Sequence, residues 1–207
     1  MQNPPQRPMF NLAITTAAAR DANLLSLGQI GLALQNCADT NGGLPLGIAD
    51  KSGKLGLSWR VALLPFIEQD NLYRAFKLDE PWDSEHNKKL IPQMPKLYAP
   101  QQRDTLGYTF YRMFSGKNAA MQKLTGGQLA TGLKVNAIAP TKLLVAEAYD
   151  PVIWTKPDEL PFAPGMAPKL GGGVFPNGFC GLLGVGSVQF LGMDAELNDL
   201  IQTSDGK

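Results

Sequence analysis

Residues 17–39 carry apolar side chains at three- and four-residue steps, the spacing that lines one face of an α-helix. At 1.5 Å per residue such a helix is about 35 Å long, and its apolar face is expected to lie on another element. Thr15 or Thr16 is the predicted N-cap, and Asn41-Gly42-Gly43 is the predicted end of the helix. The positions on or near the apolar face are Leu24, Leu27, Ile30, Gly31, Leu34 and Cys37.

The rest of the chain is rich in residues that interrupt regular structure, with 22 Gly and 16 Pro. This composition favours short strands and many turns over a helical bundle. Residues 44–57 are predicted to form a glycine-rich loop with room for a small hairpin. Residues 58–76 are predicted to be helical, with a kink or a split at Pro65.

From residue 95 onward the pattern changes to the two-residue alternation of strands. We therefore predict an α+β fold in which the long helix precedes an antiparallel sheet. The predicted organisation is a flexible lead over residues 1–14, followed by one domain over residues 15–207. The predicted strands are 95–100, 107–114, 141–148 and the hairpin 178–191, with long loops at 115–140 and 151–176 and a short helix at 194–202.

Charge and composition exclude several classes of protein. Hydrophobic residues make up 44% and charged residues 18% of the chain, which predicts a folded protein. The net charge of +1 gives no basic surface for nucleic acid or anionic membrane, so no nucleic-acid partner is expected. Two cysteines, Cys37 and Cys180, are too few for a zinc site. They are either two free thiols or one disulfide, and the sequence leaves both interpretations open.

The start of the chain is proline-rich and has no apolar run of signal-peptide or membrane-spanning length. Two interpretations stay open. The protein is cytoplasmic, or an N-terminal segment has been removed from it.

Several motifs resemble those of a prepilin-like family that is expanded in planctomycete bacteria and known as domain of unknown function 1559. WDSEHNKKL and WTKPDEL, in this order, are specific together, and the resemblance runs from about Ala17 to the C-terminus. The matching stretches are 27-LGQIGLALQN-36, 58-SWRVALLPFIEQDNLY-73, 78-LDEPWDSEHNKKLIPQMPKLY-98, 144-LVAEA-148, 154-WTKPDELPF-162, 170-LGGGVFPNGF-179 and 186-GSVQFL-191.

The resemblance implies a role rather than a reaction. Members look like type IV pilins or the major pseudopilin of type II secretion systems, so the implied fold is a long helix laid on an antiparallel sheet. It implies no enzymatic activity, no cofactor, and a place at the cell surface or in the periplasm. If an N-terminal helix has been removed, the full-length protein is expected to be anchored in the membrane by it; otherwise the location stays open. The implied partners are protein subunits of a pilus-like or secretion assembly, with self-association among the options. The residues expected to form a structural signature are Trp59, Trp82, Asp83, His86, Trp154 and Gly186.

The chain departs from this family in two places. The hydrophobic half of the N-terminal helix is absent, which puts filament assembly in doubt. Phe175 and Val185-Gly186 stand where the family often has a histidine and an Asp-Gly turn. We expect Gly184 and Val185 to form a two-residue type II′ turn, and no ligand role for a His–Asp pair there.

His86 is the only histidine, and acidic residues lie around it between positions 79 and 85. A catalytic triad is disfavoured, because Ser84 is two residues away and points elsewhere on a helix. The simpler interpretation is structural. Asp83 or Ser84 caps a short helix that ends before Pro92, and His86 holds the turn by hydrogen bonding.

Two further groups of acidic residues are candidates for ligand binding. Asp194, Glu196 and Asp199 are weak calcium candidates, since major pseudopilins bind calcium in a C-terminal loop. Acidic residues in the first turn of a helix are the simpler interpretation. Asp158-Glu159 near Trp154 has the composition of a sugar site, although such a Trp more often pins a loop to a sheet.

These observations predict a non-enzymatic structural or interaction protein. The alternative is an extracytoplasmic module that binds glycans or solutes.

Overall fold

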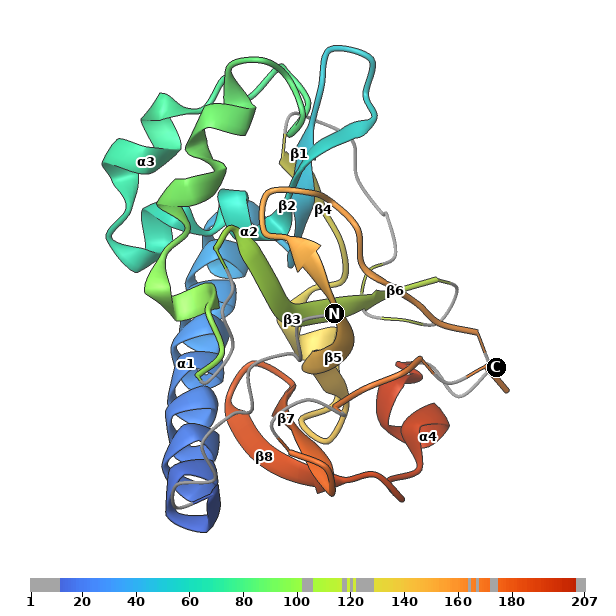
Figure 1. Ribbon diagram of the computed structural model, residues 1–207. Helices are drawn as coiled ribbons and strands as arrows, with labels where there is room; N and C mark the ends of the chain where they lie inside the picture. Colours follow the sequence, from blue (N-terminus) through green and yellow to red (C-terminus); the bar gives the residue numbers. More distant parts are fainter. Residues whose placement is uncertain are drawn as a thin grey trace.

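The structure is a computed structural model that describes residues 12–101, 106–116, 119, 121, 129–163, 165–166, 168–171 and 175–203. It is an α+β fold in which a long helix, α1 (Leu12–Asn41), lies along one side of the sheets. In Figure 1 the lower part of α1 lies beside β7 and β8, and its upper part lies beside the short helices. Because α1 begins at Leu12, neither Thr15 nor Thr16 caps it, and the helix enters the predicted flexible lead.

The strands form two sheets. The smaller sheet has the order β2-β1-β4, with antiparallel neighbours. The larger sheet has the order β6-β3-β5-β7-β8 and is antiparallel except for the short parallel pair of β3 and β6. The strands are β1 (Pro45–Ala49), β2 (Leu55–Ser58), β3 (Tyr108–Ser115), β4 (Leu129–Thr131), β5 (Leu143–Ile153), β6 (Leu160–Pro161), β7 (Gly178–Leu183) and β8 (Ser187–Gly192).

Short helices fill the connections between these strands. After β2 the chain forms three consecutive helical pieces. Pro65 lacks the N–H that would continue α2 into η1, and the left-handed Glu68 ends η1 before α3. The prediction of a split at Pro65 is therefore confirmed. The short elements are α2 (Trp59–Ala62), α3 (Asp70–Ala75), α4 (Leu197–Ile201) and the 3-10 helices η1 (Leu64–Ile67), η2 (Asn87–Gln93), η3 (Lys96–Tyr98) and η4 (Val135–Ala137).

The larger sheet is buried on both faces at β7 and at the first half of β5. α1 packs mainly against β7 and β8, and Leu27, Ile30 and Leu34 on its inner face are fully buried. A second apolar cluster on the other face includes Phe179 of β7 and Ile201 of α4. Burial on both faces explains why β7 is a continuous apolar run without alternation.

Three local predictions are wrong. Residues 95–100 contain η3 instead of a strand, because prolines at both ends deprive a strand of ladder donors and the Tyr98 N–H bonds to Pro95 O. η2 continues through Pro92 to Gln93 instead of ending before it. The β7–β8 connection has three residues, 184–186, because Leu183 pairs with Ser187; Gly184 takes the expected positive φ of 53°.

The predicted loops contain more structure than expected. β4 and η4 lie within 115–140, and β5 extends to Ile153 within 151–176. The hairpin within 44–57 is present as β1 and β2, and α4 is shorter than the predicted 194–202 helix. The first 11 residues, and with them most of the predicted lead, lie outside the described residues.

Gly31 allows the closest approach between α1 and the sheet. A Cβ atom at this position would lie 2.6 Å from Val185 O and 2.9 Å from Leu182 Cδ1. A Cβ atom at Gly28, one turn earlier, would meet only Val188 Cγ1 at 4.0 Å, an ordinary contact. The packing of α1 therefore requires glycine at position 31, whereas position 28 has room for a side chain.

Replacing each glycine by alanine tests this close packing. Gly31→Ala forces α1 away from the β7–β8 turn, and we expect the free energy of unfolding to fall by about 1–3 kcal/mol. Gly28→Ala, the matched control, gains helix propensity and should raise it by about 0.5–1 kcal/mol. Urea denaturation measures both. Equal effects of the two substitutions would contradict the contact.

Candidate functional site

Trp154 connects three segments that are distant in the sequence. Its side chain is fully buried, and its indole N–H donates to Ile91 O at 2.9 Å. The Tyr98 ring stacks on it at 5.9 Å between centroids, and the Phe76 ring meets it edge-on at 5.8 Å. Because no part of Trp154 is exposed, the ring does not offer a stacking surface for a sugar.

Arg60 and Glu159 form a buried ion pair beside this aromatic cluster. Their side chains are 0% and 5% exposed, and Arg60 Nη1 lies 2.9 Å from Glu159 Oε1, off hydrogen-bond alignment. Arg60 Nη2 donates to Glu159 Oε2 at 3.2 Å and to Tyr111 O at 2.7 Å. The pair thereby ties α2 to β3 and to the segment before β6.

Glu159 accepts further hydrogen bonds on both carboxylate oxygens. The indole N–H of Trp59 donates to Oε1 at 3.0 Å, and the Met113 N–H donates to Oε2 at 2.7 Å. Burial raises the pKa of Glu159, while the charge of Arg60 opposes that shift. Burial likewise lowers the pKa of Arg60. With both oxygens engaged, Glu159 serves as a structural acceptor at the wall of a cavity of about 160 Å³.

An outer layer of charges surrounds this pair. Arg112 Nη2 donates to Asp158 Oδ1 at 2.9 Å, and Lys156 Nζ donates to Asp158 Oδ2 at 2.7 Å. Burial works against the charge on Asp158, but the Lys156 hydrogen bond and the charge of Arg112 hold its pKa below the usual value. The Lys156 ammonium also lies 5.9 Å from the centre of the Trp82 ring. The acidic pair Asp158-Glu159 thus faces basic groups of this same chain.

Asn87 organises the loop that contains the single histidine. Its side chain is 0% exposed, and its Oδ1 accepts from the Lys77 N–H at 3.1 Å. Its Nδ2 donates to the carbonyl oxygens of Lys77, Glu80 and Pro81 at 3.0–3.1 Å. The segment 79–95 is therefore held by a buried amide that satisfies backbone groups on the loop.

His86 is half-buried and bonded to the backbone. Its Nε2 lies 2.8 Å from Ala75 O, and since a carbonyl only accepts, Nε2 carries the proton. Ser84 Oγ accepts from the Asn87 N–H at 3.1 Å, whereas Asp83 is exposed and Trp82 is half-buried. These contacts engage Nε2 with the backbone and the Ser84 hydroxyl with the Asn87 N–H.

The other predicted ligand positions do not come together. Among the described residues, no three His, Cys, Asp or Glu side chains cluster as metal ligands would, so Asp194, Glu196 and Asp199 form no such group. Asp199 O accepts from Lys142 Nζ at 2.7 Å. Gly186 is the last residue of the β7–β8 turn, where a Cβ atom would meet nothing within 4 Å.

Both cysteines are buried free thiols, so the structure contains no Cys37–Cys180 disulfide. Burial raises the pKa of Cys37 to about 11. Burial also raises the pKa of Cys180, to about 12, with a further contribution from the charge of Glu147. At neutral pH neither sulfur is the thiolate that a nucleophile or metal ligand requires.

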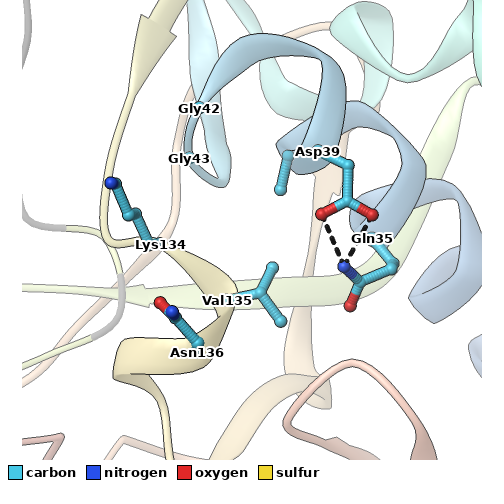
Figure 2. Close-up of a pocket in the computed structure, with 8 residues that line it drawn as sticks. Gln35, Asp39, Gly42, Gly43, Lys134, Val135 and Asn136 are labelled. Atoms are coloured by element: carbon cyan, nitrogen blue, oxygen red, sulfur yellow. Dashed lines mark hydrogen bonds between the residues drawn. The ribbon is translucent and has the colours of Figure 1, made fainter.

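Two adjoining hollows lie near the C-terminal end of α1. The first, of about 370 Å³, has Gln35 and Asp39 on one side and Lys134 and Asn136 on the other (Figure 2). Gln35 Nε2 donates to both Asp39 carboxylate oxygens at 2.8 and 2.9 Å. The second, of about 450 Å³, shares Asn136 and reaches the β7–β8 turn. Opposite charges across the first hollow suit a small zwitterion.

Sequence reasoning did not find the Arg60–Glu159 pair, Asn87 or the hollow in Figure 2. A signal for Arg60 was present, because a single charged residue inside the apolar stretch 59–64 requires a buried partner. No comparable signal marks Lys134 and Asp39, which belong to separate, exposed segments.

A comparison with protein-family profiles finds a match over residues 25–141, more than half of the chain, to a family described as "Protein of unknown function (DUF1559)". No curated protein and no solved structure is significantly similar to the chain. Among the described residues, no helix has both the length and the apolar character to cross a membrane.

Glu159→Gln tests the buried ion pair. The substitution keeps the side-chain shape but leaves the Arg60 guanidinium buried without a counter-charge, and we expect a loss of about 3–5 kcal/mol in the free energy of unfolding. Glu85→Gln is the control. The Glu85 side chain is 96% exposed and pairs with Lys89 at the surface, so its substitution should have no measurable effect on the free energy of unfolding. Denaturant titration measures both.

A second substitution distinguishes charge from shape. Adding Arg60→Met to Glu159→Gln removes the buried charge and should recover part of the loss. If the double variant is no more stable than Glu159→Gln alone, the uncompensated charge of Arg60 is not the cause of the stability loss.

Proposed function

We propose that this chain, which belongs to the DUF1559 family, is a non-enzymatic structural and interaction domain of a pilin- or pseudopilin-like surface protein. Its proposed place is the periplasm or the cell surface. Its proposed partners are protein subunits of a pilus-like or secretion assembly, including copies of itself.

The arrangement of α1 is the observation that carries the proposal. The helix lays one apolar face on β7 and β8 and keeps the opposite face exposed between residues 17 and 39. The exposed face includes Leu25 and Leu32, which are 71% and 62% exposed. Large apolar side chains on an exposed helix face favour contacts with another protein.

The contacts of three signature residues, Trp59, His86 and Trp154, and of the Arg60–Glu159 pair support the same proposal. Trp59, Arg60 and Glu159 bond to one another, and Trp154 is fully buried. His86 bonds to a backbone carbonyl. These intrachain contacts are those of residues that stabilise a scaffold, which supports a structural role.

Antibody labelling of intact cells of the source bacterium tests this role. We expect the chain to be labelled without permeabilisation and to appear in species larger than a monomer after chemical cross-linking. Permeabilised cells serve as the control for antibody access. A chain that is labelled only after permeabilisation and stays monomeric under cross-linking would contradict the proposal.

The hollow in Figure 2 favours a second candidate, an extracytoplasmic solute-binding module. Its volume of about 370 Å³ is within the range of small-molecule sites. Asp39 and Lys134 line the hollow from opposite sides and offer charges for the ammonium and the carboxylate of a free amino acid, for which the Lys134 ammonium would turn toward Asp39. The buried Trp154 gives no comparable support to a glycan site.

Calorimetric titration with a panel of free amino acids tests the second candidate. We expect heat of binding from at least one of them, with affinity at least tenfold weaker in Asp39→Asn and in Lys134→Gln. Asp21→Asn, an exposed acidic position elsewhere on α1, is the control and should bind normally. No heat at millimolar concentrations from the whole panel would exclude this candidate.

A further inference from the structure

The exposed face of α1 carries an apolar stripe. Ala18, Leu25 and Leu32 are all exposed and follow one another at seven-residue intervals. Seven residues are nearly two full helical turns, so these side chains lie in one row along the helix. A row with one exposed apolar side chain in every two turns offers contacts for a neighbouring helix.

Leu32 also stands at the edge of a groove of about 550 Å³. α1 forms one wall, and residues of η1 and the start of η3 form the other. Phe66, Ile67, Pro95 and Leu97 are half-buried, so they present apolar surface to the groove. One face of the molecule thus has both a projecting leucine and an apolar recess.

The same groove has opposite charges among its lining residues. Glu68 and Lys96 line it, and both are exposed. Within the described part of the chain, neither forms a salt bridge. Glu68 has a φ of 60°, and it is the only described non-glycine residue with a positive φ. This left-handed conformation has an energetic cost, which marks the position as one where the backbone is constrained.

We propose that this face binds a second copy of the chain in a two-fold symmetric dimer, an inference that rests on the proposed interaction role. In such an interface the same patch is used by both copies. Leu32 of each copy enters the groove of the other, and the exposed row of α1 lies against its counterpart. Glu68 of each copy faces Lys96 of the other, so the symmetry forms the same ion pair twice.

Charge reversal tests the dimer in solution with the intact chain. Sedimentation velocity over a range of concentrations should show a monomer–dimer equilibrium. Glu68→Lys and Lys96→Glu each place like charges in contact twice, and each should weaken the dimer roughly tenfold or more. Mixing the two variants restores both ion pairs in a heterodimer, and its affinity should approach that of the unchanged chain.

Leu32→Gln tests the apolar contact, and Leu106→Gln is its matched control because Leu106 is 77% exposed but lies outside α1 and the groove. We expect loss of the dimer only with Leu32→Gln. A wild-type chain that stays monomeric at millimolar concentration would overturn the inference, as would a mixture of the two charge variants that associates no better than either alone. A purified monomer whose chain is still found in cross-linked surface assemblies would sink this dimer and leave the proposed function standing.

Discussion

Arg60 carries a charge into the interior, and the packing of the surrounding elements depends on how that charge is compensated. Glu159 provides the counter-charge from 99 residues further along the chain, and Tyr111 O accepts two hydrogen bonds from the guanidinium. The buried hydroxyl of Tyr98 donates to Arg60 O at 2.9 Å, which adds η3 to the same centre. The pair of charges thus connects α2, β3 and the segment before β6, and the backbone of Arg60 connects η3 to them. Loss of either partner would leave a buried charge that costs more than most single contacts contribute.

This centre explains why the motifs around it are so distinctive in composition. The stretches beginning at Trp59 and Trp154 look like candidates for chemistry because they combine tryptophan with charged residues. In the folded chain the tryptophan N–H groups and the charges satisfy one another or nearby backbone groups. The loop around Asn87 follows the same rule, with a buried amide bonded to backbone. A motif of polar and aromatic residues can thus record the requirements of packing alone.

Much of the fold was predictable from local patterns, whereas the contacts of the site were not. The long helix, the break at Pro65 and the β7–β8 hairpin follow from periodicity and from proline and glycine chemistry. The strand predicted at residues 95–100 is wrong because four residues between two prolines are too few to separate a strand from a 3-10 turn. The partner of Arg60 was out of reach, since no local pattern relates residues 99 positions apart. Asn87 gave no signal either, because buried and exposed asparagines look alike in a sequence.

The two cysteines have a consequence for the conditions that the fold tolerates. Each thiol is enclosed in the core, and the structure has no cross-link between them. The stability of the domain therefore does not depend on a bond that reducing agents break. Oxidants in turn meet no exposed thiolate to attack on these residues. The same fold is therefore expected in reducing and in oxidising compartments, and its folding needs no enzyme that forms disulfides.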